Sequence, residues 1–352
     1  MQYWQFLDPP PRSAPIDKLS DKFSREDVWS ALGKIKRHKA PGKDGIPADF
    51  LQACLQEQPT DVEPGRPAPL PPPTPLTDAL MTLLNFAYSN HTIPPSWEES
   101  IVISLPKDGD LADPGNYCGI SLMFTTLKVI TVILATCISK AGEEQKLFSP
   151  TQAGFCHLEE AVTQAACVIN ILQRRQIAGS CTYAVFIDLK KAYDTVPHGV
   201  LFAKLARFGI SGRCLAFLQG LYARSKISVQ VGVEAEAQYS DSFPLCRGLR
   251  QGCPLSPVLF NILINDLLDG MEEVAGVGVP CGLKATWGKP NLRVAGALFA
   301  DEAWDLTEDI LGASRFCNRI TQWTSTHEME VGIQKCGILE ITPSGDDVDS
   351  LT

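Results

Sequence analysis

The sequence lacks the marks of several classes of protein. None of its 12 cysteines forms a C-x-x-C pair, and no histidine stands at ligand spacing from a cysteine pair, so neither a zinc site nor a disulfide scaffold is indicated. No positively charged start followed by an apolar segment opens the chain. The apolar run 129–138 is too short to span a bilayer and predicts a buried helix, so we expect a soluble, intracellular protein with no membrane partner.

Positive charge is scarce as well. The 352 residues carry a formal net charge of −9, whereas phosphate binding draws on lysine and arginine, so any contact with nucleic acid must be local. Hydrophobic residues make up 45% of the chain, enough to cover the core of one large domain or two lobes. One basic stretch consists of Lys34, Lys36, Arg37, Lys39 and Lys43. Such a run is by itself more often a solvated helix face than a binding site.

Local patterns predict the elements of the first half. Ser24 is an N-cap candidate with Asp27 three residues on, and the apolar spacing after it predicts a helix up to Arg37. The turn at 41–45 ends this helix because it is rich in glycine and proline. The other elements expected here are helices at 50–56, 77–88 and 158–175 and a strand at 99–105.

Carboxylates follow two strand-like segments in the second half. The apolar run 183–187 is typical of a strand buried on both faces, and Asp188 follows it directly. A second run, 294–300, precedes Asp301 and Glu302, which predicts a hairpin with both acids at its turn. One acid after a strand is more often a turn residue or a helix cap. Two strands with the same ending favour a shared site instead.

Acids converging from neighbouring strands suit phosphoryl transfer. Two Mg²⁺ ions about 3.5 to 4 Å apart can stabilise the attacking and the leaving oxygen of an in-line displacement. Mg²⁺ prefers hard oxygen ligands and keeps part of its shell for water and substrate phosphates, so two or three acids suffice. Between the two strands, glycine and proline in 247–257 predict an irregular loop, and Ser256 and Pro257 predict the start of a buried helix.

The order of several segments resembles the motif series of reverse transcriptases from non-LTR (LINE-type) retrotransposons. The sequence FIDLKKAYD resembles the first catalytic motif, with the acid, alanine and aromatic at Asp188, Ala192 and Tyr193. FADE at 299–302 resembles the aromatic-Ala-Asp-Asp hairpin. The other matching segments are 39–47 (N-terminal extension), 105–109 and 116–122 (fingers hairpin), 149–155, 248–257 (nucleotide-site motif) and 332–336 (Lys-bearing motif). The resemblance covers about residues 24 to 342.

The resemblance implies an α+β fold of the right-hand polymerase type. We expect fingers and a palm, with a small antiparallel palm sheet that carries both acid motifs, helices packed on its back, and a thumb that is largely missing. The domains implied are 1–23 (N-terminal segment), 24–58 (N-terminal extension), 59–76 (Pro-rich insertion or linker), 77–180 (fingers), 181–342 (palm) and 343–352 (acidic tail).

The activity that the resemblance implies is RNA-directed DNA synthesis, in which a dNTP is added to a DNA primer on an RNA template. Asp188, Asp301 and Glu302 would hold Mg²⁺ or Mn²⁺, and Lys335 would protonate pyrophosphate; without the resemblance, Lys335 reads as a surface charge. The nucleotide site implied comprises Lys107, Leu189, Tyr193, Gln251 and Gly252. The residues implied at the template are Lys39, Lys43 and Arg250.

Tyr193 would select deoxynucleotides or, on the plainer interpretation, pack in the core. A nuclear rather than cytoplasmic location follows from the resemblance alone, and no oligomeric state is indicated.

Three positions depart from the family pattern. Glu302 replaces the second hairpin aspartate, moving its charge by one methylene in a site where about 1 Å can cost on the order of 10²-fold in rate. Cys118 and Cys156 replace arginines, and a thiol lacks the planar donors that engage phosphate. The alternative function is therefore a catalytically decayed retroelement remnant that only binds RNA. A small-molecule enzyme of another α/β fold has little support, because no Gly-rich phosphate loop or nucleophile elbow accompanies the strands.

Processive synthesis by this chain should be poor. The sequence ends at Thr352, soon after Lys335, where the resemblance implies a thumb, and no endonuclease domain precedes Met1, so we expect a fragment or a decayed copy. A primer-extension assay on an RNA template measures this directly. Products longer than a few added nucleotides would contradict the expectation.

Overall fold

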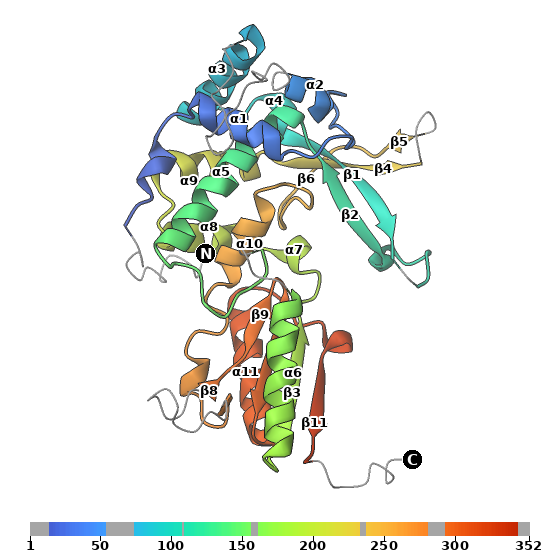
Figure 1. Ribbon diagram of the computed structural model, residues 1–352. Coiled ribbons are helices and arrows are strands. Elements are labelled where there is room, and N and C mark those ends of the chain that lie inside the picture. The colour runs from blue at the N-terminus through green and yellow to red at the C-terminus, as the bar shows by residue number, and fades with distance from the viewer. Residues whose placement is uncertain are drawn as a thin grey trace. The chain divides into compact units, whose positions relative to one another are not determined.

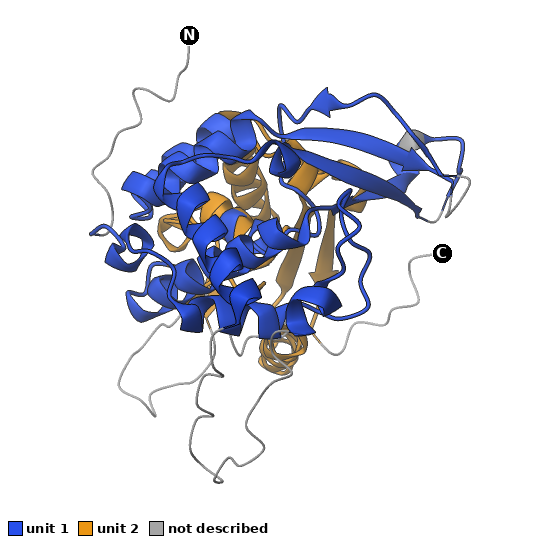
Figure 2. Cartoon of the chain, turned by 90° about the horizontal axis from the view of Figure 1, so that it is seen from above, with its two compact units in different colours: residues 1–147, 198–259 blue, residues 148–197, 260–352 orange. Residues whose placement is uncertain are grey.

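The chain divides into two compact units. The computed structural model describes residues 14–53, 74–107, 109–155, 161–232, 237–280 and 293–343 (Figure 1). Unit 1 comprises 1–147 and 198–259, and unit 2 comprises 148–197 and 260–352 (Figure 2). Residues 198–259, which the predicted boundaries assign to the palm, belong to unit 1, so the compact units do not follow the predicted functional domains, which stay a prediction. The Pro-rich insertion and the acidic tail lie almost wholly outside the described residues.

The first helix of unit 1 begins where the sequence predicts. In α1 (Arg25–Lys34) the Ser24 hydroxyl accepts a hydrogen bond from the backbone N–H of Asp27, and the Asp27 carboxylate accepts one from the N–H of Ser24. This capping box satisfies two N–H groups that the first turn leaves unpaired. The remaining helices of unit 1 are α2 (Ala48–Gln52), α3 (Pro75–Ser89), α4 (Pro95–Glu98), α5 (Thr125–Glu144), α8 (His198–Arg207) and α9 (Gly212–Ala223), with 3₁₀ turns at Asp17–Ser20 and Pro114–Asn116.

Helix α5 is longer than the apolar run 129–138 suggested. By length and composition it could cross a membrane, and it is the one such helix among the described residues. However, 61% of its apolar window is buried inside the chain. Leu127, Ile130, Leu134 and Ile138 are fully buried, and the helix packs against α1 and α3. Its apolar side therefore forms part of the core of unit 1.

The sheet of unit 1 is built on a hairpin. β1 (Glu99–Pro106) pairs antiparallel with β2 (Tyr117–Leu122), as predicted for residues 99–105, and parallel with β4 (Lys226–Val231). Two short strands, β5 (Gln238–Tyr239) and β6 (Phe243–Pro244), add to β4. The hairpin carries Lys107 and Cys118 toward its tip.

Unit 2 contains the predicted small antiparallel sheet. Its order is β11 (Gly337–Ile341), β3 (Thr182–Asp188), β10 (Glu302–Thr307) and β9 (Ala297–Phe299), with all neighbours antiparallel. β3 thus pairs on both sides. The other elements of unit 2 are α6 (Ala161–Ile177), α7 (Ala192–Thr195), most of α10 (Ser256–Ile264), β7 (Val279–Pro280), β8 (Arg293–Val294), α11 (Ile310–Thr326) and 3₁₀ turns at Met271–Glu273 and Ile333–Lys335.

β3 is not buried on both faces, contrary to the prediction. Ala184, Val185 and Ile187 are buried, but Phe186 is 44% exposed. Helix α6 packs against Ala184 and Leu306 and runs beside Phe186 without closing over it. An open groove remains between them, and Asp188, Glu302 and Lys335 are among its lining residues.

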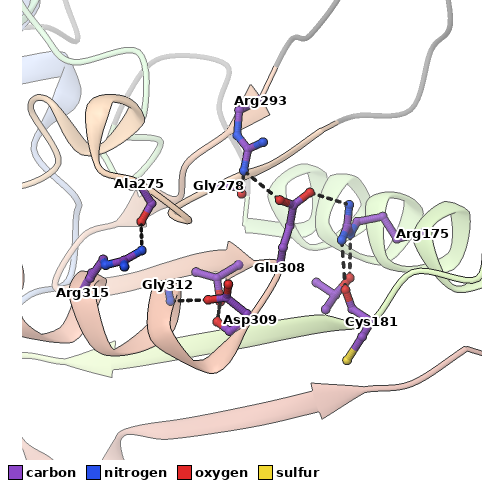
Figure 3. Close-up of polar contacts among 11 residues, drawn as sticks. Arg175, Cys181, Ala275, Gly278, Arg293, Glu308, Asp309, Gly312 and Arg315 are labelled. Atoms are coloured by element: carbon purple, nitrogen blue, oxygen red, sulfur yellow. Dashed lines mark hydrogen bonds and ion pairs between the residues drawn. The ribbon is translucent and has the colours of Figure 1, made fainter.

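The sheet end remote from the acids is fastened by ion pairs (Figure 3). The Arg175 guanidinium, at the end of α6, donates to the Thr182 hydroxyl at 2.6 Å and to the Cys181 carbonyl at 3.0 Å. Glu308 lies between Arg175, at 3.8 Å, and Arg293, at 3.4 Å. Because Arg175 is almost fully buried, these bonds hold α6 to the start of β3 more firmly than surface pairs would.

One buried carboxyl in the sheet has no hydrogen-bond partner. Asp305 of β10 is 0% exposed, and no described group donates to either of its oxygens, although the N–H groups of Gly278 and Leu306 lie nearby. Burial raises the pKa of Asp305 to about 7, because the charged form loses its hydration.

Replacing this carboxyl should stabilise the protein at alkaline pH. The folded-state pKa of Asp305 lies above the ~3.9 of an unfolded aspartate, so the unfolded state gains relative stability as pH rises from about 4 to about 7. Asp305→Asn should therefore raise the free energy of unfolding on the order of 2–4 kcal/mol at pH 8, and by much less near pH 4. Denaturant titrations at both pH values, with the exposed Asp241→Asn as control, measure this. No gain at pH 8 would mean that the carboxyl is hydrated.

Candidate functional site

Strand register brings the three predicted acids to one end of the sheet in unit 2. Glu302 stands directly opposite Asp188 in the antiparallel β10–β3 pair. Side chains at opposite positions share a face, with Cβ atoms about 4.5–5.5 Å apart. Asp301 occupies the turn before β10, and its carbonyl accepts a hydrogen bond from the N–H of Leu189 at 3.4 Å. The predicted hairpin, with the acids at its turn, is therefore present.

The turn of this hairpin is held by the segment 149–155. Ala300 adopts a left-handed conformation, with φ of 55°, which is uncommon outside glycine. The Gln152 side-chain oxygen accepts hydrogen bonds from the N–H groups of Ala300, at 3.1 Å, and Gly154, at 2.6 Å. A Cβ on Gly154 would collide with the backbone of Ala300. No role for Gln152 or Gly154 follows from the sequence alone, although both lie in the segment 149–155, which matches the motif series.

A second segment encloses Asp188 from the other side. The N–H of Gly332 donates to the Asp188 carbonyl at 2.8 Å, and the N–H of Asp188 donates to the Cys336 sulfur at 3.4 Å. Two residues further on, the N–H of Lys190 donates to the Glu330 carbonyl at 2.9 Å. These bonds fix the backbone around Asp188 and bring Lys335 beside it.

Lys335 forms an ion pair with Asp188. Its ammonium lies 3.3 Å from one carboxylate oxygen and 3.4 Å from the other. The Asp188 side chain is 16% exposed, whereas that of Lys335 is 73% exposed. Burial, followed by the negative charge of Asp188, raises the pKa of Asp301, and Lys335 partly offsets this. The cation therefore acts on both acids.

The chemistry of these side chains fits a divalent cation. Carboxylates from two neighbouring strands are the hard oxygen donors that Mg²⁺ and Mn²⁺ bind. Among the described residues, however, no three His, Cys, Asp or Glu side chains already converge in ligand positions. Instead, the ammonium of Lys335 forms an ion pair with the carboxylate of Asp188. Asp188, Asp301 and Glu302 could hold a cation once that ammonium withdraws.

Two further predicted residues lie close to the acids. Tyr193 stacks on Phe260 with ring centroids 4.8 Å apart, and its buried hydroxyl has no hydrogen-bond partner among the described residues. Burial, and then the charge of Asp301, raise the pKa of Tyr193. Leu189 is 2% exposed, so only its main chain could contact a nucleotide. The packing role of Tyr193 is present, and its selection of deoxynucleotides stays a prediction.

The remaining nucleotide-site candidates belong to unit 1. Lys107 is exposed at the end of β1, and its N–H donates to the carbonyl of Asn116 at 2.7 Å. The Cys118 thiol donates to the side-chain oxygen of Gln251 at 3.1 Å. Gly252 has φ of +98°, and a Cβ there would lie 3.1 Å from the Ser121 carbonyl. The predicted residues thus gather on the β1–β2 hairpin, whereas Cys156 lies outside the described residues.

The basic stretch borders a groove of about 680 Å³ in unit 1. Lys39 lines this groove, and Lys43 pairs instead with Glu99 at 2.9 Å. Lys128, from α5, also lines it and was missed from the sequence, because it is far from the stretch in the chain. Burial lowers the pKa of Lys128. The other basic and apolar groove residues include Lys34, Lys36, Ile103, Leu105, Ile120 and Val132.

Arg250 does not occupy the position expected of a template-binding residue. It is 2% exposed, and its guanidinium donates to the Ser225 hydroxyl at 2.7 Å and to the main-chain carbonyls of Trp97 and Glu98 at 3.2–3.3 Å. Its two terminal nitrogens bind the protein itself, whereas its buried Nε has no partner among the described residues. In this position Arg250 fastens the loop before α10, and its contact with a template stays a prediction.

Comparisons with known proteins agree on one family. A family model described as reverse transcriptase (RNA-dependent DNA polymerase) matches residues 105–345. The chain is 27% identical over 190 residues to a retrovirus-related Pol polyprotein from the type-1 retrotransposable element R2 of Popillia japonica, covering 54% of this chain and 26% of that one. It is 22% identical over 343 residues to the polyprotein of the type-2 element R2DM of Drosophila melanogaster, covering 95% and 29%.

A solved structure is also similar. Apo telomerase from Candida tropicalis, truncated from the C-terminal domain, aligns with a TM-score of 0.48 at 14% identity, covering 77% of this chain and 57% of that one. The chain spans about a quarter of the length of the two polyproteins.

Adding one methyl group at Gly332 should displace Asp188. Gly332 has an ordinary φ of −82°, but a Cβ there would lie 2.7 Å from the Asp188 carboxylate. Gly332→Ala should cost about 1–3 kcal/mol in the free energy of unfolding and weaken Mn²⁺ binding. Gly337→Ala is the matched control, since its Cβ would meet nothing within 4 Å. Denaturation and Mn²⁺ titration test both variants; equal behaviour would show that the loop tolerates a shift.

Proposed function

We propose a function for this chain from one premise, which is that it belongs to the reverse transcriptase (RNA-dependent DNA polymerase) family. The prediction of a reverse transcriptase of the non-LTR retrotransposon type is confirmed by the family match and by the relatives from R2 elements. Because the chain spans about a quarter of those relatives, its own activity and substrates are proposals.

The proposed reaction is addition of a dNTP to the 3′ hydroxyl of a DNA primer, directed by an RNA template. Reverse transcriptases use divalent cations, which would activate the attacking hydroxyl and neutralise charge on the phosphates. Asp188 and Asp301 are the proposed ligands, and Glu302, whose carboxylate is one methylene further from the backbone, is a proposed weaker ligand. Mg²⁺ is the proposed ion, and Mn²⁺ would substitute for it. Lys335 is the proposed proton donor to pyrophosphate.

The observation that carries this proposal is the register of β3 and β10. Asp188 and Glu302 are opposite partners on neighbouring strands, and Asp301 occupies the adjoining turn. All three acids lie within the matched residues 105–345. Such an arrangement delivers several carboxylates to one point without distorting the backbone of either strand.

Recognition of the substrates is proposed for both units. Tyr193 in unit 2 would contact the sugar of the incoming nucleotide, and Leu189 would offer its main chain. Lys107, Gln251 and Gly252 in unit 1 would contact the nucleotide, and Lys39 and Lys43 the template. Phosphate groups bind lysine through charge, so these contacts should weaken as salt increases. The nuclear location that the resemblance implies stays a prediction.

A second candidate function is RNA binding without chemistry. Two features favour it. Cys118, whose thiol donates to Gln251, stands where the resemblance implies a phosphate-binding arginine, and the groove of unit 1 is lined by lysines and apolar side chains. If this function is correct, the chain would bind RNA in the absence of Mg²⁺, and the Asp188→Asn variant would bind RNA as tightly as the natural chain. Replacing Lys36, Lys39 and Lys128 together by glutamine would weaken that binding.

Single-nucleotide extension of a DNA primer on an RNA template tests the polymerase. The chain should incorporate the complementary dNTP with Mg²⁺ or Mn²⁺, and Asp188→Asn should reduce the rate by at least on the order of 10²-fold, because a cation ligand is lost. The exposed Asp241→Asn serves as control. The double variant Cys118→Arg, Glu302→Asp should be faster than the natural chain, since it restores the arginine donors and the shorter acid.

Each outcome separates the two functions. Incorporation that vanishes in Asp188→Asn establishes the polymerase. Incorporation by the double variant alone assigns the natural chain to the RNA-binding function. If no variant incorporates a nucleotide, the assignment of Asp188 and Asp301 as catalytic ligands is refuted for this chain.

A further inference from the structure

We propose that Lys335 is the resident counter-ion of Asp188, and that a divalent cation enters the site by displacing the Lys335 ammonium from this carboxylate. The proposal concerns regulation of the same acids and rests on the function proposed above. It differs from proton donation, because it assigns Lys335 a role before any substrate or metal is bound.

The charges at this end of the sheet require a cation. Asp188, Asp301 and Glu302 lie on two neighbouring strands and their turn, and like charges so placed repel each other. Lys335 contacts both oxygens of Asp188, at 3.3 and 3.4 Å. Lys335 therefore neutralises part of the negative charge in the metal-free protein, as a divalent ion would in the metal-bound protein.

The contact uses the oxygens that a metal would need. Asp188 is mostly enclosed, with 16% of its side chain exposed, and Gly332 closes on one of its oxygens. With that ammonium in place, no three described carboxylate, imidazole or thiolate side chains are arranged to bind a metal. On the proposal, a cation that takes these oxygens as ligands replaces the ammonium.

The Lys335 side chain can move away from Asp188 without a change in the sheet. Its side chain is 73% exposed, and it belongs to the 3₁₀ turn Ile333–Lys335 rather than to a strand. The backbone of this turn stays anchored through Gly332 and Cys336. Rotation of the lysine side chain alone would release Asp188, and the ammonium would remain within a few ångströms of the site.

Cation titration of a charge-removed variant tests the proposal. Lys335→Met keeps the length of the side chain but lacks the ammonium, so it should bind Mn²⁺ about twofold to fivefold more tightly than the natural chain, as expected for loss of a partly exposed ion pair. Lys190→Met is the matched control, because Lys190 is also exposed and pairs with Glu330 at 2.7 Å rather than with the acids. It should change the affinity less than twofold.

Two further measurements test whether the gain in affinity comes from the Lys335–Asp188 ion pair. In an Asp188→Asn background, the gain from Lys335→Met should vanish, because the competition requires that carboxylate. In metal-free buffer, Lys335→Met should melt at a lower temperature than the natural chain, yet show a larger rise when Mn²⁺ is added.

Mn²⁺ affinity of Lys335→Met equal to or weaker than that of the natural chain would overturn the proposal, as would a gain of the same size in Lys190→Met. The outcome is independent of polymerase activity. A gain in affinity together with no incorporation by any variant refutes the proposed function and leaves the exchange of Lys335 for metal standing. Incorporation without a gain refutes only the exchange.

Discussion

Negative charge concentrated at one end of a small antiparallel sheet is the constraint on which the functional geometry depends. β3 carries Asp188 at its end and is paired on both sides, so the position of that carboxylate is set by β10 and β11 together. The same register that places Glu302 beside it creates repulsion, which Lys335 offsets. The proposed chemistry requires the charges to be close, and folding requires them to be compensated.

Close approach of backbone to the acids explains two residues that carry no charge. Gly332 leaves room for an Asp188 oxygen, and Gly154 leaves room for the turn of the acid hairpin. Gln152 then satisfies the N–H of Ala300 in its left-handed conformation. Asp305 shows the opposite situation, since burial raises the pKa of its carboxyl and makes the charged form costly. The acid end is thus held by local fit, while β10 also carries a carboxyl whose ionisation opposes folding.

The sequence predicts local features of this fold well and its long-range features less well. The capping box of Ser24 and the acid hairpin depend on residues a few positions apart, so pattern alone identifies them. Exposure of Phe186 depends on how far α6 reaches across the sheet, and the enclosed position of Arg250 depends on carbonyls more than 150 positions away. The sequence does not indicate Lys128 as a groove residue, because only folding brings α5 beside the basic stretch 34–43. The motif series fixes the family, whereas the partner of each side chain comes from the structure.

The most direct test of this account is a crystal structure of the chain with Mn²⁺, in which anomalous scattering locates the ion. The account predicts an anomalous peak within coordination distance of both Asp188 and Asp301, with the Lys335 ammonium no longer in contact with Asp188. A structure in which Lys335 still pairs with Asp188 at saturating Mn²⁺, and in which the ion binds elsewhere or not at all, would contradict it.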